Sequence, residues 1–227
     1  MKYTKTIHAK FIDRPNRFIA HVQVDGRVET VHVKNTGRCR ELLLPDATVI
    51  LAVADNPNRK TKYDLIAVYK KGIGLINMDS QAPNAVVGEY LTGCDEITFI
   101  KPEYKYGDSR IDFYFEKGDT KCLMEVKGVT LERDGICYFP DAPTERGVKH
   151  IRELIKAKED GYEVYLAFVI QMEGVTEALP NQEMHPEFAM AYNEAVAAGV
   201  KIVNFQCGVR EDELWIKSKS AIADKNS

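Results

Sequence analysis

Alternating apolar and polar residues predict short β-strands through the first third of the chain. The clearest pair lies on either side of Asp25-Gly26, a dipeptide favoured in two-residue hairpin turns. With three further apolar runs, the expected strands cover residues 17–24, 28–33, 48–53, 65–68 and 72–76. About five short strands joined by loops are typical of a small barrel of the oligonucleotide-binding (OB) kind. We therefore expect an OB-like domain over residues 1–80.

Near residues 79–83 the pattern changes, and helical periods then alternate with apolar runs. The expected helices cover residues 83–91, 143–161 and 187–198. The expected strands cover residues 97–100, 109–115, 121–129, 164–170, 200–205 and 214–216. Since the run 164–170 is almost uninterrupted and apolar, it is typical of a buried central strand. This order predicts a second domain over residues 81–227, an α/β fold with a mixed sheet.

Composition narrows the class of protein. The 227 residues are 44% hydrophobic and 29% charged, which is usual for a soluble globular protein, and no run of about 18 apolar residues could span a bilayer. The basic N-terminus lacks the apolar segment of a signal peptide, so we expect a cytoplasmic protein that does not bind membranes. Five scattered cysteines without zinc-ligand spacing favour reduced thiols.

Charge is distributed unevenly along the chain. Residues 1–80 contain 14 Lys and Arg against 8 Asp and Glu, whereas the remaining residues contain 17 against 26. This separation fits an anion-binding module joined to a module that concentrates carboxylates around a metal. Charge alone proves neither function.

The strongest chemical signal is Asp112 followed thirteen residues later by Glu125-Val126-Lys127. Side chains alternate along a strand, so Glu125 and Lys127 share one face. The Gly118-Asp119 pair between the two apolar runs is a turn signal, and a hairpin there brings Asp112 opposite the region of Glu125. Two carboxylates and one ammonium group are therefore expected to converge.

Such a set suits a metal site that acts on phosphodiesters. Mg²⁺ prefers oxygen ligands, which Asp112, Glu125 and the Val126 carbonyl could supply while leaving positions open for substrate and water. Lys127 could orient the attacking water or stabilise charge developing on the phosphate. The alternative is a surface hairpin whose acids and lysine are simply solvated.

A second polar cluster occurs at the expected helix start around residues 139–150. Arg146, Lys149 and His150 lie within one helical turn, with Arg146 and His150 at i and i+4. Together with the helix N-terminus they could hold a phosphate. The alternative is a helix capped by Thr144 with an exposed basic face.

Four blocks of the chain now stand out: Asn35-Thr36-Gly37, Lys105-Tyr106-Gly107 leading into residues 109–113, residues 125–131, and residues 139–147. In identity and order they resemble the motifs of the sugar fermentation stimulation protein A family, and the resemblance covers nearly the whole chain. It implies an N-terminal OB-like domain, a C-terminal domain similar to PD-(D/E)XK nucleases, DNA binding, and a role in regulating sugar utilisation.

The resemblance also assigns site residues. The nuclease-like signature falls on Asp112, Glu125 and Lys127, which become the expected catalytic residues. An upstream helical glutamate often completes such metal sites, and Glu89 is the expected third ligand beside Asp112 and Glu125, with Glu103 as the alternative. One departure is that Arg110-Ile111 precedes Asp112, so the usual Pro-Asp pair is absent.

Basic residues are expected to contact DNA phosphates, namely Arg14, Arg17, Arg38, Arg59, Lys60, Arg146 and Lys149. Phe11, Phe18 and Tyr63 are candidate stacking partners, although the alternating pattern around Phe18 favours a core position for that ring.

These features lead to a main hypothesis and two alternatives. The main one is a DNA-binding protein with a Mg²⁺- or Mn²⁺-dependent phosphodiesterase site. The first alternative is a non-catalytic DNA-binding transcriptional regulator of sugar (maltose) metabolism. The second, an enzyme acting on a sugar phosphate, is disfavoured because no G-x-x-x-x-G-K phosphate loop occurs. Whether the chain forms a homodimer stays open.

Overall fold

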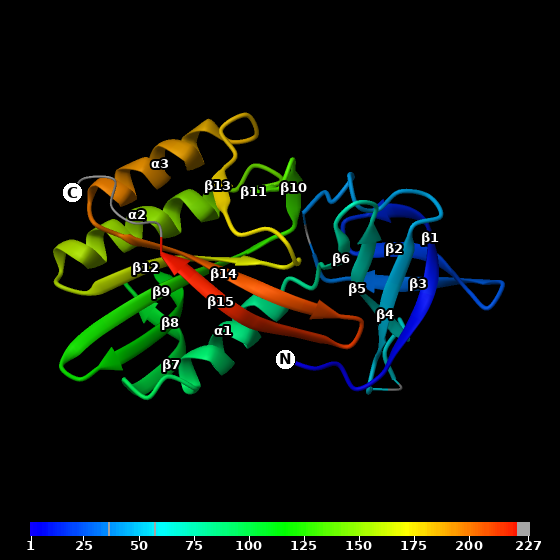
Figure 1. Cartoon of the computed structure of the whole chain (residues 1–227), viewed down its shortest axis with the longest axis horizontal. Coiled ribbons are helices and arrows are strands. Elements are labelled where there is room, and N and C mark those ends of the chain that lie inside the picture. The colour runs from blue at the N-terminus through cyan, green and yellow to red at the C-terminus, as the bar shows by residue number, and fades with distance from the viewer. Residues whose placement is uncertain (36, 57, 222–227) are drawn as a thin grey trace.

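Six strands from the first third of the chain form one sheet that closes into a barrel (Figure 1). The sheet order is β3-β2-β1-β4-β5-β6, and β3 also pairs in parallel with β5, which closes the ring. The strands are β1 (Thr6–Asn16), β2 (Ile19–Val24), β3 (Arg27–Val33), β4 (Thr48–Val53), β5 (Tyr63–Lys70) and β6 (Gly74–Asn77). The predicted small barrel is present, and β1 is the strand that the alternation pattern did not predict.

This computed structural model describes residues 1–35, 37–56 and 58–221. Three parts of the expectations lie outside these ranges: Thr36 in the first family block, Pro57 in the expected OB-like domain, and residues 222–227 of the expected second domain.

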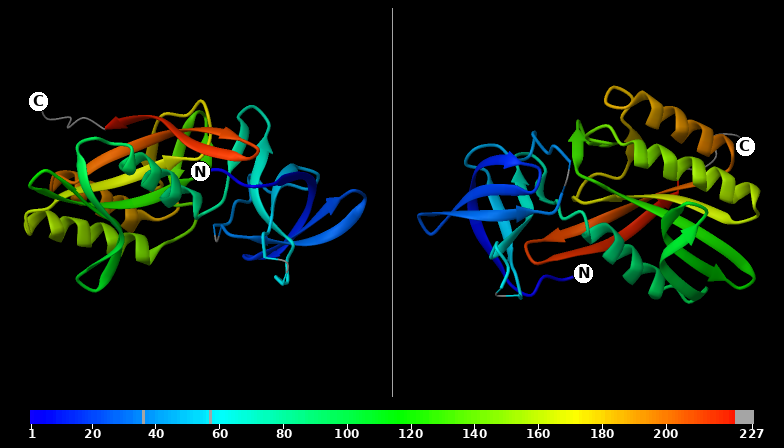
Figure 2. Two further views of the ribbon diagram at one scale, coloured as in Figure 1. Left: turned by 90° about the horizontal axis from the view of Figure 1, so that it is seen from below. Right: turned by 180° about the vertical axis from the view of Figure 1, so that it is seen from behind.

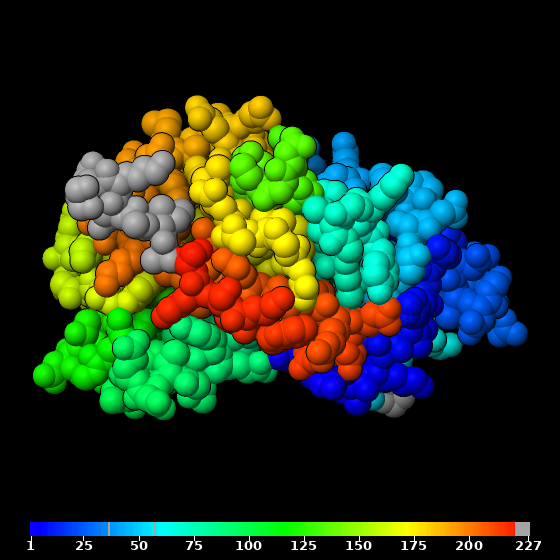
Figure 3. Space-filling model, in the orientation of Figure 1, coloured from blue at the N-terminus to red at the C-terminus, as the bar shows by residue number. Residues whose placement is uncertain are grey.

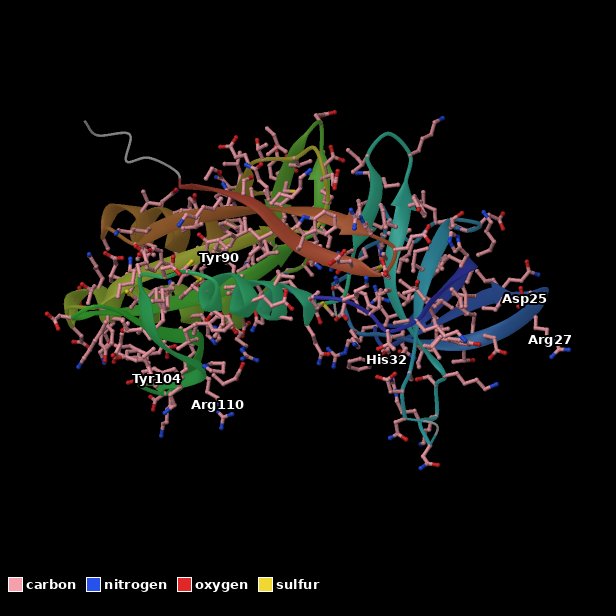
Figure 4. All side chains as sticks on the ribbon, turned by 60° about the horizontal axis from the view of Figure 1, so that its bottom comes forward. Asp25, Arg27, His32, Tyr90, Tyr104 and Arg110 are labelled. Atoms are coloured by element: carbon pink, nitrogen blue, oxygen red, sulfur yellow. The ribbon has the colours of Figure 1, made fainter. Side chains whose placement is uncertain are left out.

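The turn between β2 and β3 is the one that its sequence predicts. Asp25 and Gly26 have φ angles of 48° and 78°. Positive φ at both central residues is the requirement of a type I′ turn, which Asp-Gly meets at low cost. Figure 4 places Asp25 and Arg27 at the tip of this hairpin, on the side of the barrel away from the second domain.

The second domain is built on a six-stranded mixed sheet with the order β15-β14-β12-β9-β8-β7. The strands β9, β12 and β14 run parallel, whereas the outer pairs are antiparallel. Its strands are β7 (Ile97–Tyr106), β8 (Ser109–Lys117), β9 (Thr120–Val129), β12 (Glu163–Ile170), β14 (Lys201–Arg210) and β15 (Glu213–Ala221). A small extra sheet, which was not predicted, contains β10 (Leu131–Arg133), β11 (Ile136–Phe139) and β13 (Ala178–Pro180).

Helices cover both faces of the mixed sheet (Figures 1 and 2). One face packs against α2 (Glu145–Glu159) and α3 (Pro186–Ala197), and the other packs against α1 (Ala82–Thr92). The strand β12 lies between β9 and β14 and is buried on both faces, with Leu166 and Phe168 in one core and Ala167 and Val169 in the other. This two-sided burial explains its uninterrupted apolar sequence.

The two domains are joined by specific polar contacts as well as by the chain between β6 and α1. The turn of the β14–β15 hairpin reaches the barrel, where Glu211 accepts a hydrogen bond from Tyr69 at 2.7 Å and contacts His8 at 2.9 Å. Nearby, Lys70 of β5 pairs with Glu132 of β10 at 2.5 Å. Figure 3 shows the hairpin, in orange and red, lying against the blue N-terminal segment. Among the described residues, no helix is both long and apolar enough to cross a bilayer.

An ion cluster at the far end of the sheet makes stability depend on pH. Lys117 and Lys201 contact the two oxygens of Glu163 at 2.6 and 2.8 Å, and Tyr165 also donates to it. Burial alone would raise the pKa of Glu163, but these donors outweigh it and lower the pKa to about 2. A depressed carboxyl pKa stabilises the fold above the unfolded value of about 4.3, and this contribution is lost as the pH falls toward 2.

We therefore expect Glu163→Gln to be less stable than wild type at neutral pH, by at most about 3 kcal/mol, with the difference vanishing near pH 2. Urea unfolding of both proteins between pH 6 and pH 2.5 measures it. Parallel stability curves for the two proteins over this range would contradict the assignment.

Candidate metal and nucleic-acid site

The β8–β9 hairpin brings the first two acids together. It turns at Gly118, which has a φ of +56°, and backbone pairing runs from Lys117–Thr120 to Phe113–Met124. Beyond the Phe113–Met124 pair, a side chain replaces the backbone as hydrogen-bond acceptor: Oδ2 of Asp112 accepts a hydrogen bond from Val126 N at 2.8 Å. The carboxylate thus occupies a ladder position of β9 at the point where regular pairing with β8 ends.

Asp112 is held on both oxygens. Besides the contact to Val126, its Oδ1 accepts a hydrogen bond from Nδ2 of Asn84, in the first turn of α1, at 2.8 Å. Burial raises the pKa of Asp112, and the neighbouring Glu125 carboxylate raises it further. Asn84 lies 28 positions before Asp112 in the chain, and no sequence pattern marked it as a site residue.

Glu125 lies at the centre of the cluster and is only 1% exposed. Its Oε1 contacts Nζ of Lys127 at 2.5 Å and is hydrogen-bonded to Nδ1 of His150. Burial by itself would raise the pKa of Glu125, but the Lys127 ammonium and His150 outweigh it and hold the pKa below its usual value. The alternation of β9 therefore places the acid and the lysine together, and α2 adds a histidine.

The start of α2 connects this cluster to an arginine. Thr144 caps the helix by accepting a hydrogen bond from Gly147 N at 3.0 Å, as the alternative interpretation of this segment expected. Arg146 Nε donates to His150 Nε2 at 3.3 Å, so the Nδ1 proton of this histidine is directed to Glu125. His150 is buried, and it links Arg146 to Glu125 rather than facing a phosphate.

The donor atoms fit a hard divalent cation. Glu125 Oε2 is buried and has no hydrogen-bond partner, which is costly unless something else satisfies it. Among the described residues, no three His, Cys, Asp or Glu side chains form a group that could hold a metal. An ion here would therefore depend on Asp112, Glu125, backbone carbonyls and water, a mixture that Mg²⁺ accepts.

The structure does not bring the expected third ligand to this site. Glu89 lies five positions after Asn84 on α1, about 140° around the helix, and pairs with the Met1 amino group at 2.5 Å. Glu103 is exposed and lies opposite Asp112 in the β7–β8 register, between the pairs Pro102–Phe113 and Tyr104–Ile111. The prediction for Glu89 is thus corrected, and Glu103 does not join the two carboxylates.

A cleft of about 640 Å³ lies between the two domains beside this cluster. Its charged lining residues are Arg17 from the barrel and Lys127, Asp141 and Arg146 from the second domain. Three of these four side chains are cationic, so the cleft favours an anion. Arg17 and Arg146, two of the expected DNA contacts, thus both line this cleft.

Other predicted DNA contacts are engaged elsewhere. Arg14 donates to four backbone carbonyls, those of Arg17, Asn35, Gly37 and Arg38, at 2.6 to 3.0 Å. Arg59 forms a two-point pair with Asp64 at 2.6 and 3.0 Å. Both guanidinium groups organise loops of the barrel, and their assignment as phosphate ligands stays a prediction.

The remaining candidates are spread over the surface. Arg38 and Lys60 are exposed on the barrel, whereas Lys149 faces a separate depression on the outer side of α2 and lies 3.9 Å from Glu153. Phe11 is buried and Tyr63 is partly buried against the core. The pattern was misleading for Phe18, which is 44% exposed and has the Arg17 guanidinium 4.7 Å from its ring centre.

Comparison with protein family models tests the family resemblance that the four sequence blocks indicated. Residues 12–78 match the family model described as the SfsA N-terminal OB domain. Residues 81–213 match the model described as the sugar fermentation stimulation protein RE domain. The chain belongs to the sugar fermentation stimulation protein family. The predicted fold, an OB barrel followed by a restriction-endonuclease-like α/β domain, is confirmed.

Relatives within the SfsA family extend over almost the whole chain. A sugar fermentation stimulation protein homolog of Clostridium beijerinckii is 54% identical over 220 residues, which are 96% of this chain and 97% of the relative. One of Desulfitobacterium hafniense is 54% identical over 216 residues, 94% of each protein. The structure of Pyrococcus furiosus SfsA in complex with Ca²⁺ is 26% identical, covers 96% of each chain and has a TM-score of 0.86.

Proposed function

We propose that this protein binds DNA and cleaves its phosphodiester bonds with a bound divalent metal, Mg²⁺ or Mn²⁺. The observation that carries the proposal is the buried, unpartnered Oε2 of Glu125 beside Asp112 and Lys127. An acid with one oxygen held by Lys127 and His150 and the other left unsatisfied is arranged as a ligand rather than as a structural ion pair. The Ca²⁺ complex of the Pyrococcus furiosus relative supports a divalent cation in this family.

Each side chain of the cluster has a distinct role in this proposal. Asp112 and Glu125 would hold the ion, which supplies charge neutralisation and an activated water when bound. Asn84 and His150 fix the orientation of these two carboxylates. Lys127 lines the cleft and would orient the attacking water or stabilise charge on the phosphate. Arg17 and Arg146 would bind the phosphate backbone from the two walls.

Cleavage assays with Lys127→Met test the catalytic part. We expect wild type to cut labelled DNA with Mg²⁺ or Mn²⁺, and the variant to lose about 100-fold or more in rate, as when one electrostatic stabiliser is removed from an active site. Lys121→Met is the matched control, because Lys121 is an exposed lysine of the same strand. The catalytic form is excluded if wild type leaves every DNA intact over hours with either metal.

A non-catalytic DNA-binding regulator of sugar metabolism is the second candidate. One observation favours it: Lys127 and His150 already satisfy Glu125 Oε1, so the cluster holds together without an ion. The names of the relatives also refer to sugar fermentation. DNA affinity that falls steeply with salt, without cleavage, would favour this alternative. Cleavage that Lys127→Met abolishes would rule it out.

A further inference from the structure

The cleft between the domains joins a loop of the barrel to the candidate metal site. Arg17 belongs to the short β1–β2 connection, the loop that OB folds commonly use to contact oligonucleotides. On the other wall, Val126 and Lys127 directly follow Glu125, and Arg146 lies in the first turn of α2. Partly exposed Tyr138 adds an aromatic side chain to the lining.

The walls of this cleft are held at a fixed separation. A Cβ atom on Gly37 of the barrel would overlap with the Asp141 carboxylate of the second domain, and Cys39 N donates to Oδ2 of Asp141 at 3.4 Å. Farther along the interface, Lys70 Nζ bonds both the carbonyl and the carboxylate of Glu132. Widening the cleft requires breaking these contacts, which favours a ligand that fits the present width.

The size of the cleft selects the form of DNA. Pockets of roughly 300 to 1,000 Å³ hold a drug-sized molecule, which is the scale of one or two nucleotides and not of a double helix. Resting on the proposed function, we infer that the cleft admits an unpaired DNA strand, from a single strand or a frayed end. Its phosphates would lie among Arg17, Lys127 and Arg146, and a base would stack on Tyr138.

Fluorescence anisotropy in EDTA tests the inference without any contribution from cleavage. The probes are a labelled 12-nucleotide single strand, a blunt duplex of the same sequence, and that duplex with an unpaired tail. We expect the single strand and the tailed duplex to bind at least about 10-fold more tightly than the blunt duplex. Tyr138→Ala should weaken single-strand binding by about 10- to 100-fold, the range of one lost stacking contact. Arg17→Ala removes a phosphate contact and should weaken single-strand binding to a similar extent.

Arg27→Ala is the matched control for Arg17→Ala, because Arg27 lies at the far hairpin tip of the same barrel (Figure 4). Tyr138→Phe keeps the ring and should retain binding, which separates stacking from a folding defect. The inference is overturned by equal or tighter binding of the blunt duplex, by equal effects of Arg17→Ala and Arg27→Ala, or by no DNA binding at all. If the blunt duplex binds as tightly as the single strand and is cleaved with Mg²⁺, the inference fails but the proposed function stands. If the single strand binds but no DNA is cleaved, the inference stands and only the catalytic part of the proposed function fails.

Discussion

Mn²⁺ binding should be lost in Glu125→Gln, while the protein stays folded. The substitution preserves side-chain volume and one carbonyl oxygen, but it removes the charge that an ion needs. It also replaces one of the two carboxylate oxygens, the unpartnered Oε2 or Oε1, with an amide nitrogen, which is a hydrogen-bond donor. Loss of an outer-sphere partner alone weakens metal affinity by about 10- to 100-fold, so removing a direct ligand should weaken it by more than about 100-fold. Isothermal titration calorimetry with Mn²⁺ measures the change.

The matched control is Glu89→Gln on α1. Glu89 was the expected third ligand, but its side chain is 60% exposed and pairs with the Met1 amino group. We therefore expect Glu89→Gln to bind Mn²⁺ as wild type does. Circular dichroism establishes that both variants fold. Unchanged Mn²⁺ affinity in Glu125→Gln, or its loss in Glu89→Gln, would show that the ligand set is wrong.

The second large effect is expected from Gly128→Ala, because no space exists for a methyl group at this position. The new Cβ would lie 2.5 Å from Gln171 Oε1 and 2.6 Å from Pro83 Cγ. Neither neighbour can yield easily: Gln171 is buried and its Nε2 donates to Asn77 at 2.8 Å and to the Asp79 carbonyl at 3.1 Å. Overpacking of this kind destabilises by about 1 to 3 kcal/mol.

Gly128→Ala should also impair DNA cleavage, because relief of the clash shifts the part of β9 that carries the adjacent Lys127. Urea unfolding measures the loss of stability, and the cleavage assay measures the loss of activity. Gly93→Ala is the control: its φ is negative, and its Cβ would meet neighbouring carbonyl oxygens at an ordinary 3.6 Å. Equal stability of the two variants would contradict the tight packing at Gly128.

Local patterns predicted most of the fold because turns, caps and burial leave short-range signals. Asp25-Gly26 specified a type I′ turn, Thr144 specified a helix start, and the apolar run of β12 specified a strand buried on both faces. The strands β10, β11 and β13 were not predicted, because strands of three or four residues are too short to show a period.

The arginines of the barrel show what local sequence patterns do not predict. Sequence gives Arg14, Arg17 and Arg59 the same character, yet their surroundings differ. Arg14 is surrounded by backbone carbonyls and Arg59 meets the carboxylate of Asp64, whereas Arg17 lines the cleft. Which acceptor an arginine meets depends on how loops fold against it, and spacing along the chain does not encode that.

The sequence by itself determined the strand–turn–strand unit that pairs Asp112 with Glu125 and the alternation that adds Lys127, because these relations span few residues and follow the fixed period of a strand. Only the tertiary structure decided that Asn84 and His150 orient the two carboxylates, that Glu89 lies elsewhere, and that the barrel closes a cleft over the site. Those contacts join elements far apart in the chain, so packing of whole helices and domains sets them.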